Sequence, residues 1–197
     1  NTEIITNGID LKTINNLCKS INQKNYQRSG IISIRGLSSL YQIQEIIKSR
    51  NFCGMNDIPI SFIYPFYEEK YKESILNQLS SKDKNLGRLD KINMYKLLLR
   101  SELVISIPNS DSSPRSVFES IFCGCIVAIS YNQYYDNFPE SLKARIILID
   151  LKQKDWFSST VLKSNQLSKS TFAPCRDALR LFDQEKTIES MANTLLI

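Results

Sequence analysis

Two carboxylates and one arginine carry side chains suited to holding a ligand. Asp111 and Glu119 lie eight positions apart in the run NSDSSPRSVFESIFCGCIV (residues 109–127), around the expected start of a helix. Arg35 stands near the end of a separate apolar run, GIISIRG. A guanidinium can bond two oxygens of a phosphate at once, whereas a carboxylate repels phosphate and accepts hydrogen bonds from hydroxyl groups. These residues therefore predict a ligand with both phosphates and hydroxyls.

Five apolar, β-branched runs recur along the chain with amphipathic segments between them. They are GIISIRG (30–36), IPISFIY (58–64), ELVISIP (102–108), CIVAISY (125–131) and ARIILIDL (144–151). This alternation predicts an α/β fold, a doubly wound, Rossmann-like parallel sheet covered on both faces. The strand ends then share one edge, where helix N-termini direct free amides at a crevice. Arg35 and residues 109–127 belong to that edge, and a ligand that fits both is a nucleotide sugar.

Helix starts and stops follow from capping residues. The N-caps that we expect are Ser39, in a capping box with Gln42 that opens a helix over 40–50, then Asp90, and then Ser113 followed by Pro114. Gly124 should end the third of these helices. After Leu151 the pattern predicts C-terminal helices that pack around the sheet, whereas residues 1–15 look like a strand and a turn.

Composition narrows the class of protein. The 197 residues carry a net charge of +5 spread along the chain, which favours anionic partners such as phosphates or a lipid surface over nucleic acid. They include no histidine, the commonest metal ligand. The five cysteines show no local pairing pattern, and no signal peptide or run of about 20 apolar residues is recognisable. We expect a reduced, cytoplasmic protein without a metal site.

The line SDSSPRSVFESIFCGCIVAIS resembles the donor-binding motif of family 4 retaining glycosyltransferases, in which seven residues separate two acids. Glu119 matches the second acid, and Asp111 stands where the family has Glu. The family's first-strand motif resembles ISIRGL, and its stretch past the nucleobase resembles NLGRLDKINMYKLLLRSELVISIPNSDSSP. The segment between its two domains resembles TNGID. The resemblance therefore covers roughly the whole chain. Tyr41 stands where the family often has a Lys. The family's polysaccharide-assembly branch, which this sequence most resembles, also has Tyr at this position.

The resemblance implies one half of a GT-B fold. Residues 25–197 would be the C-terminal, donor-binding domain, and residues 1–24 would enter from a missing N-terminal domain that holds the acceptor. The donor would be a UDP- or GDP-sugar with no further cofactor, and the acceptor a growing surface glycan or a lipid-linked sugar. The full-length enzyme would work in the cytoplasm, with peripheral association at the inner face of the cell membrane as an option.

The resemblance also implies roles for single residues. Arg35 would contact the diphosphate, Glu119 the ribose and Asp111 the transferred sugar, which makes these three the catalytic set. The expected donor-binding set is Arg35, Gly36, Tyr41, Arg88, Ser112, Ser113, Arg115, Ser116 and Glu119. Phosphate or sugar would meet the amides near Arg115 and Ser116, and the departing nucleoside diphosphate would be stabilised there without a metal.

Each of these residues also has a plain structural interpretation. Arg35 alone would be an ordinary strand-end cation, and Arg88 a solvated charge. Glu119 would be the exposed residue of an amphipathic helix, and Asp111 a side chain that holds a turn. The Cys123-Gly-Cys125 pair fits small core residues better than a zinc site. Trp156 and Phe157 are expected to anchor a helix rather than to stack on a ligand.

Two other functions stay open at this point. A sugar-nucleotide epimerase shares the two-domain plan but needs acid–base residues that we cannot place in a chain without histidine. A non-catalytic, flavodoxin-like binding module shares the sheet, because doubly wound folds host many functions.

Overall fold

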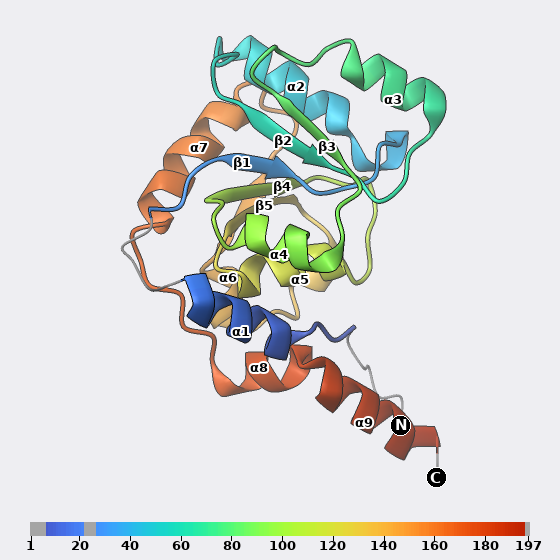
Figure 1. The fold of residues 1–197 in the computed structure, drawn as a ribbon. Helices are drawn as coiled ribbons and strands as arrows, with labels where there is room; N and C mark the ends of the chain where they lie inside the picture. Colours follow the sequence, from blue (N-terminus) through green and yellow to red (C-terminus); the bar gives the residue numbers. More distant parts are fainter. Residues whose placement is uncertain (1–6, 22–26, 196–197) are drawn as a thin grey trace.

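The computed structural model describes residues 7–21 and 27–195, which contain one six-stranded parallel sheet in the order β3-β2-β1-β4-β5-β6 (Figure 1). The strands are β1 (Ile31–Ser33), β2 (Ile60–Ile63), β3 (Lys84–Gly87), β4 (Leu103–Ser106), β5 (Ile126–Ser130) and β6 (Ile146–Ile149). The strand order turns back at β1, which pairs with β2 on one side and with β4 on the other. The doubly wound parallel sheet expected from the sequence is confirmed.

Helices cover both faces of the sheet. They are α1 (Leu11–Ile21), α2 (Ile43–Phe52), α3 (Glu69–Leu76), α4 (Lys91–Leu98), α5 (Arg115–Phe122), α6 (Glu140–Lys143), α7 (Trp156–Leu167), α8 (Arg176–Phe182) and α9 (Gln184–Leu195), with 3-10 turns at Ser39–Tyr41 and Gln133–Tyr135. Figure 1 shows α2, α3 and α7 on one face and α4, α5 and α6 on the other, with α1 and α8 beyond them. None of the helices in the described ranges combines the length and apolarity needed to cross a membrane.

Alternate residues of each strand face opposite sides of the sheet and enter two separate cores. In β4, Val104 packs in the core shared with α4 and α5, whereas Ile105 packs in the core shared with α2 and α7. All four β4 residues are buried, as expected for a central parallel strand. Burying one such side chain fully stabilises the fold by about 1.5–3 kcal/mol, so both layers of helices contribute to holding the central strands.

Two arginines hold helix ends at the edge where the strands begin. Arg28 and Arg145 donate hydrogen bonds to backbone carbonyls at or just after the C-termini of α4, α5 and α7. The accepting carbonyls are those of Leu98, Ser101, Cys123, Gly124, Leu167 and Ser170. Their positive charge meets the negative ends of these helices. Since the helices run antiparallel to the strands, their N-termini lie at the opposite edge.

The helix boundaries correct several predictions. Asp90 caps α4 as expected, accepting from the backbone N–H of Asn93, and Gly124 follows α5 in the left-handed region as expected. Ser39 opens no capping box, because it lies in a 3-10 turn, and Gln42, with φ of 50°, separates that turn from α2.

Two further corrections concern α5 and α1. The N-cap of α5 is Pro114 rather than Ser113. Residues 11–15, predicted as part of a strand and turn, form the start of α1, whose Ile14 is buried in the core that α8 shares. The remainder of the predicted entering segment includes residues 1–6 and 22–24, which lie outside the described residues.

Candidate functional site

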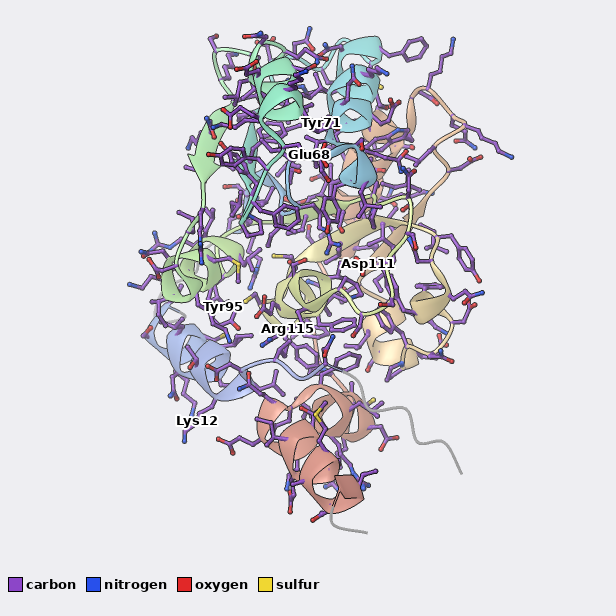
Figure 2. All side chains as sticks on the ribbon, turned by 90° about the vertical axis from the view of Figure 1, so that its right-hand side faces the viewer. Lys12, Glu68, Tyr71, Tyr95, Asp111 and Arg115 are labelled. Carbon is purple, nitrogen blue, oxygen red and sulfur yellow. The ribbon has the colours of Figure 1, made fainter. Side chains whose placement is uncertain are left out.

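The predicted site residues gather where the strand order reverses. The segment after β1 leads to α2 on one face, whereas the segment after β4 leads to α5 on the other face. The two segments diverge and leave a crevice at the carboxyl edge, the usual ligand position in open parallel sheets. Figure 2 looks onto this edge and shows Asp111 and Arg115 near the start of α5, with Tyr95 on the neighbouring α4.

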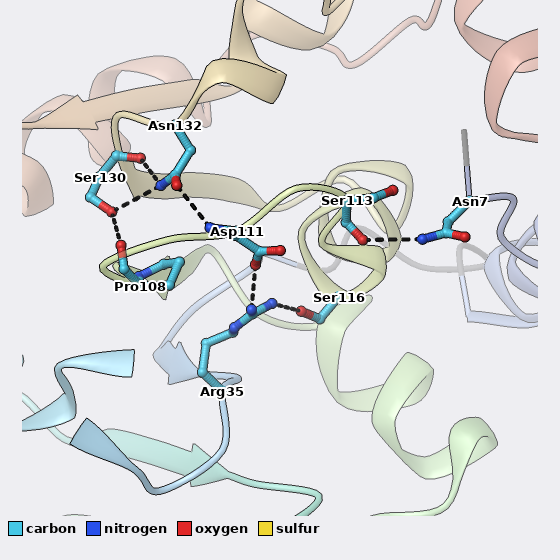
Figure 3. Close-up of polar contacts among 8 residues, drawn as sticks. All are labelled: Asn7, Arg35, Pro108, Asp111, Ser113, Ser116, Ser130 and Asn132. Atoms are coloured by element: carbon cyan, nitrogen blue, oxygen red, sulfur yellow. Dashed lines mark hydrogen bonds and ion pairs between the residues drawn. The ribbon is translucent and has the colours of Figure 1, made fainter. Parts of the chain in front are cut away.

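Arg35 is bonded to two other predicted residues (Figure 3). One guanidinium nitrogen, Nη2, forms an ion pair with the Asp111 carboxylate, and the other, Nη1, donates to Ser116 Oγ at 3.0 Å. The guanidinium also lies over the Tyr41 ring, 4.5 Å from its centre, within the range of a cation–π contact. Arg35 is therefore not an isolated strand-end charge, because it links the segments after β1 and β4.

The loop that carries Asp111 is held by a residue that sequence reasoning missed. Asn132 Oδ1 accepts a hydrogen bond from the Asp111 backbone N–H at 2.9 Å, and Asn132 in turn donates to the carbonyl of Ser130. The Asp111 carboxylate forms an ion pair with Arg35 and does not hold the loop itself. The side chain that bonds the loop backbone is that of Asn132 (Figure 3). Asn132 follows β5 at the same edge as the predicted residues, a position that would have flagged it.

A groove of about 560 Å³ runs beside these residues. It is lined by Ile34, Ile63, Pro65, Arg88, Leu89, Lys91, Met94, Arg115, Ser116 and Glu119. Four of these residues belong to the predicted donor-binding set, and they come from the loop after β3 and from α5. Ser116 both lines the groove and bonds Arg35. Ser116 therefore joins the contacts around Arg35 and the groove into one site.

Glu119 is buried rather than solvent-facing, with 7% of its surface exposed. Its Oε1 accepts a hydrogen bond from the Tyr95 hydroxyl at 2.8 Å. Burial raises the pKa of Glu119 above its ordinary value, although the Tyr95 hydrogen bond and the positive charges of Lys91 and Arg115 act against that rise. The alternative interpretation, in which Glu119 is the exposed residue of an amphipathic helix, is therefore wrong. A tyrosine on the inner face of α4 needs a partner for its hydroxyl, which is the signal that would have pointed to Tyr95.

The remaining predicted residues stand further from these contacts. Gly36 lies under Phe66, and a Cβ there would come within 2.6 Å of the ring, so this position needs a glycine unless Phe66 moves. Ser112 is exposed, and the Ser113 carbonyl accepts from the Asn7 side chain at 3.5 Å. The structure places these three residues at the same edge but records no hydrogen bond from them to Arg35 or Glu119.

The residues that the sequence assigned to the core are in the core. Cys123 and Cys125 are 1% and 0% exposed, and burial raises the pKa of the Cys125 thiol to about 12. No group of three or more His, Cys, Asp and Glu side chains suited to a metal occurs among residues 7–21 and 27–195. Trp156 and Phe157 are buried at the start of α7 and fix it on the sheet.

No family model and no curated protein matches this sequence. Many solved structures match its fold, and three of them illustrate the likeness. AviGT4, a glycosyltransferase involved in avilamycin A biosynthesis, aligns with 98% of the chain at a TM-score of 0.70 and 14% identity. HepE from Anabaena, solved with UDP and glucose, aligns with 98% at 0.74 and 17% identity. A UDP-forming α,α-trehalose-phosphate synthase from Burkholderia xenovorans, solved with glucose-6-phosphate, aligns with 97% at 0.67 and 10% identity.

The chain spans only part of these proteins. It covers 57% of AviGT4, 56% of HepE and 51% of the trehalose-phosphate synthase. The low identities mean that the likeness concerns the fold. The chain has the fold of one domain of a GT-B glycosyltransferase.

Proposed function

We propose that this chain is the donor-binding domain of a glycosyltransferase that takes its sugar from a nucleoside-diphosphate sugar. One observation carries the proposal. Ser116 joins the Arg35–Asp111 pair to a groove lined by Glu119 and Arg88, at the crevice where the strand order reverses. A linear ligand with phosphates, a ribose and a base matches such a connected row of cationic and carboxylate groups.

The diphosphate is assigned to Arg35 and to the first amides of α5. The amides in question are those of Arg115 and Ser116, because the next two N–H groups donate to the Pro114 carbonyl. The helix end also carries positive partial charge. The ribose is assigned to Glu119, which lies about one turn beyond Ser116 on α5, and the base to the part of the groove near Arg88. Asp111 is then left for the hydroxyls of the transferred sugar.

These positions suggest how the chain would help the reaction. Transfer breaks the bond between the sugar's anomeric carbon and a diphosphate oxygen, and the negative charge grows on the departing nucleoside diphosphate. Arg35 and the start of α5 would stabilise that charge, which lowers the barrier to departure. Retention of the sugar's configuration and a surface-glycan or lipid-linked acceptor are part of the proposal and rest on the resemblance in sequence.

Ligand-dependent stabilisation tests the proposal directly. The purified chain is heated with UDP-, GDP- or ADP-glucose, because a ligand that binds only the folded state raises its apparent stability, by about 2.7 kcal/mol at 100 times its dissociation constant. UDP is the first candidate, since HepE was solved with UDP. We expect one nucleotide sugar to raise the melting temperature. No stabilisation by any of the three would contradict the proposal.

Arg35→Ala tests where the diphosphate lies. Removing the guanidinium should weaken UDP binding by about 10- to 100-fold, the equivalent of roughly 1.5–3 kcal/mol, and should leave uridine binding unchanged. Calorimetry measures both affinities. Arg100→Ala is the matched control, because Arg100 is exposed and is not among the residues that line the groove. Equal losses for UDP and uridine would show that Arg35 is structural.

A further inference from the structure

The Glu119 carboxylate is held on one side by a residue of another helix. Within the described residues its one recorded hydrogen bond comes from the Tyr95 hydroxyl, which donates to Oε1 at 2.8 Å. Tyr95 belongs to α4 and Glu119 to α5, and the two helices pack side by side. Figure 2 labels Tyr95 at α4, beside the helix that Arg115 begins. The contact therefore fixes the carboxylate relative to a second element.

Tyr95 is itself fixed. Its side chain is 0% exposed and lies in the core that contains Leu98 and Phe118. The Lys91 ammonium lies over the ring, 5.6 Å from its centre. A buried phenol has no access to bulk water and needs an acceptor inside the protein. The Tyr95 hydroxyl is consequently tied to Glu119 Oε1, and its ring has little freedom to turn away.

This contact leaves one oxygen of Glu119 for the ligand. Oε2 has no recorded protein partner in the described part of the chain, and Glu119 lines the groove. We propose that Tyr95 is a positioning residue, which holds Oε1 so that Oε2 is presented to the ribose hydroxyls of the nucleotide. The inference rests on the proposed function and deepens it, because it names the group that orients the ribose contact.

The bond also affects the charge of Glu119. Facing it are Tyr95 and Lys91 from α4, Arg115 and Cys123 from α5 and its end, and Asp10 from the segment before α1. Burial raises the pKa of Glu119, and the hydrogen bond from Tyr95 is the largest influence that lowers it. Without the hydroxyl the pKa should rise further. Nucleotide binding should then be lost at a higher pH than in the wild-type protein.

Tyr95→Phe tests the proposal, because phenylalanine keeps the buried ring and removes only the hydroxyl. We expect UDP binding to weaken by about 3- to 10-fold at pH 8, and by a larger factor at pH 6, where more of the variant's Glu119 is protonated. Calorimetry at both pH values gives the two ratios. A merely structural role would lower the melting temperature without changing the pH profile of binding.

Tyr64→Phe is the matched control. Tyr64 is also buried, and its hydroxyl donates to the Asn85 side chain at 2.7 Å, but it packs in the core on the other face of the sheet. This variant should lose stability in the same way and bind UDP with the wild-type affinity and pH profile. A Tyr64→Phe effect equal to that of Tyr95→Phe would overturn the proposal.

A ligand without ribose hydroxyls completes the test. With 2′,3′-dideoxy-UDP, wild type and Tyr95→Phe should bind almost equally, because the oriented oxygen has nothing to accept. A Tyr95→Phe deficit that persists undiminished with this ligand, or no deficit with UDP at either pH, would overturn the positioning role alone. If the wild-type chain binds no nucleotide, or Glu119→Gln leaves UDP affinity unchanged, the proposed ribose site fails and this inference fails with it.

Discussion

At the scale of single residues, the ion pair between Arg35 and Asp111 has the most direct consequence for binding. The Asp111 carboxylate is paired with the same guanidinium to which we propose that the diphosphate binds. A phosphate ligand must therefore displace Asp111 from at least part of Arg35. The released carboxylate is then available to accept hydrogen bonds from the sugar, so the two events are coupled.

Asp111→Asn separates these events. Without the competing charge, UDP should bind up to about fivefold more tightly, since a partly screened ion pair contributes roughly 0.2–1 kcal/mol. The preference for UDP-sugar over UDP should shrink, because an amide accepts hydroxyls less well than a carboxylate. Calorimetry with both ligands measures this. Asp136→Asn, an exposed carboxylate after β5, should change neither affinity, and weaker UDP binding by Asp111→Asn would contradict the competition.

Glu119 should affect stability and binding in opposite directions as pH changes. Its pKa in the folded protein is raised above the ordinary 4.5, so the folded state holds the proton more tightly than the unfolded state does. The stabilisation that follows is complete below about pH 4.5 and is lost as the pH rises through the raised pKa. Ribose binding needs the ionised form and should increase over the same range.

Glu119→Gln isolates this contribution. The neutral side chain can still accept from Tyr95, so the variant should become more stable relative to wild type as the pH rises from about 5 to about 8. It should bind UDP more weakly at the upper pH by about 10-fold or more. Urea unfolding and calorimetry at matched pH supply the two measurements. Glu73→Gln, on the exposed face of α3, should show neither change.

At the scale of elements, the turn between α5 and β5 depends on one glycine. Gly124 has φ of +86°, and a Cβ there would lie 2.7 Å from Arg28 Nη2, which bonds the carbonyl that ends α5. Gly30 has φ of +90° with open space around it. Both glycines adopt a backbone conformation that costs other residues roughly 1–2 kcal/mol.

The two glycines therefore form a matched pair of variants. Gly30→Ala should lose about 1–2 kcal/mol of stability from the backbone alone. Gly124→Ala should lose clearly more, because the new methyl group also displaces Arg28 from the carbonyls after α4 and α5. Urea unfolding of both variants gives the comparison. Equal losses would mean that Arg28 moves aside without cost.

Elements with continuous apolar runs were predictable, and elements without them were not. All five predicted strands are present, because each is a short run of mostly buried apolar residues, and the four central ones are covered on both faces of the sheet. The edge strand β3 reads KNLG with exposed Lys84 and Asn85, and α3 buries only Ile75. Neither leaves an apolar pattern to detect. Gln42 shows a different limit, since its side chain bonds the distant Ile107 carbonyl, a contact that local capping rules cannot include.

The site was predictable only as far as strand ends define it. Arg35, Asp111 and Ser116 were expected at one edge and are bonded together there. Tyr95 and Asn132 were missed, because each acts through a partner far along the chain. A sequence pattern identifies residues that face a ligand more readily than residues that hold those residues in place.

At the scale of the whole molecule, one buried ion pair ties together the half of the sheet that comes first in the chain. Arg50 and Asp83 have side chains only 1% and 0% exposed, with Nη2 2.8 Å from Oδ2. Asp83 also accepts from the backbone N–H groups of Ile60 and Ser80. Burial would raise the pKa of Asp83, but these bonds outweigh it and the pKa is lowered. The pair joins α2, β2 and the start of β3.

Asp83→Asn should destabilise the whole fold by about 3–5 kcal/mol, because it leaves the Arg50 charge buried without a counter-ion. The lowered pKa means that this stabilisation is present near neutral pH and lost as the pH falls through the folded-state pKa. Urea unfolding at several pH values checks both statements. Asp57→Asn removes an exposed pair with Lys82 and should leave the unfolding midpoint unchanged. A small loss for Asp83→Asn would show that water reaches Arg50.

The position of β1 in the middle of the sheet has a consequence for synthesis of the chain. Ile31 pairs with Ile60 on one side but with Leu103 on the other, so the second neighbour of β1 leaves the ribosome much later than the first. Until β4 arrives, a half-made molecule of β1, β2 and β3 presents an open apolar strand edge. Such edges recruit other chains, so this nascent half depends on protection until β4 covers β1.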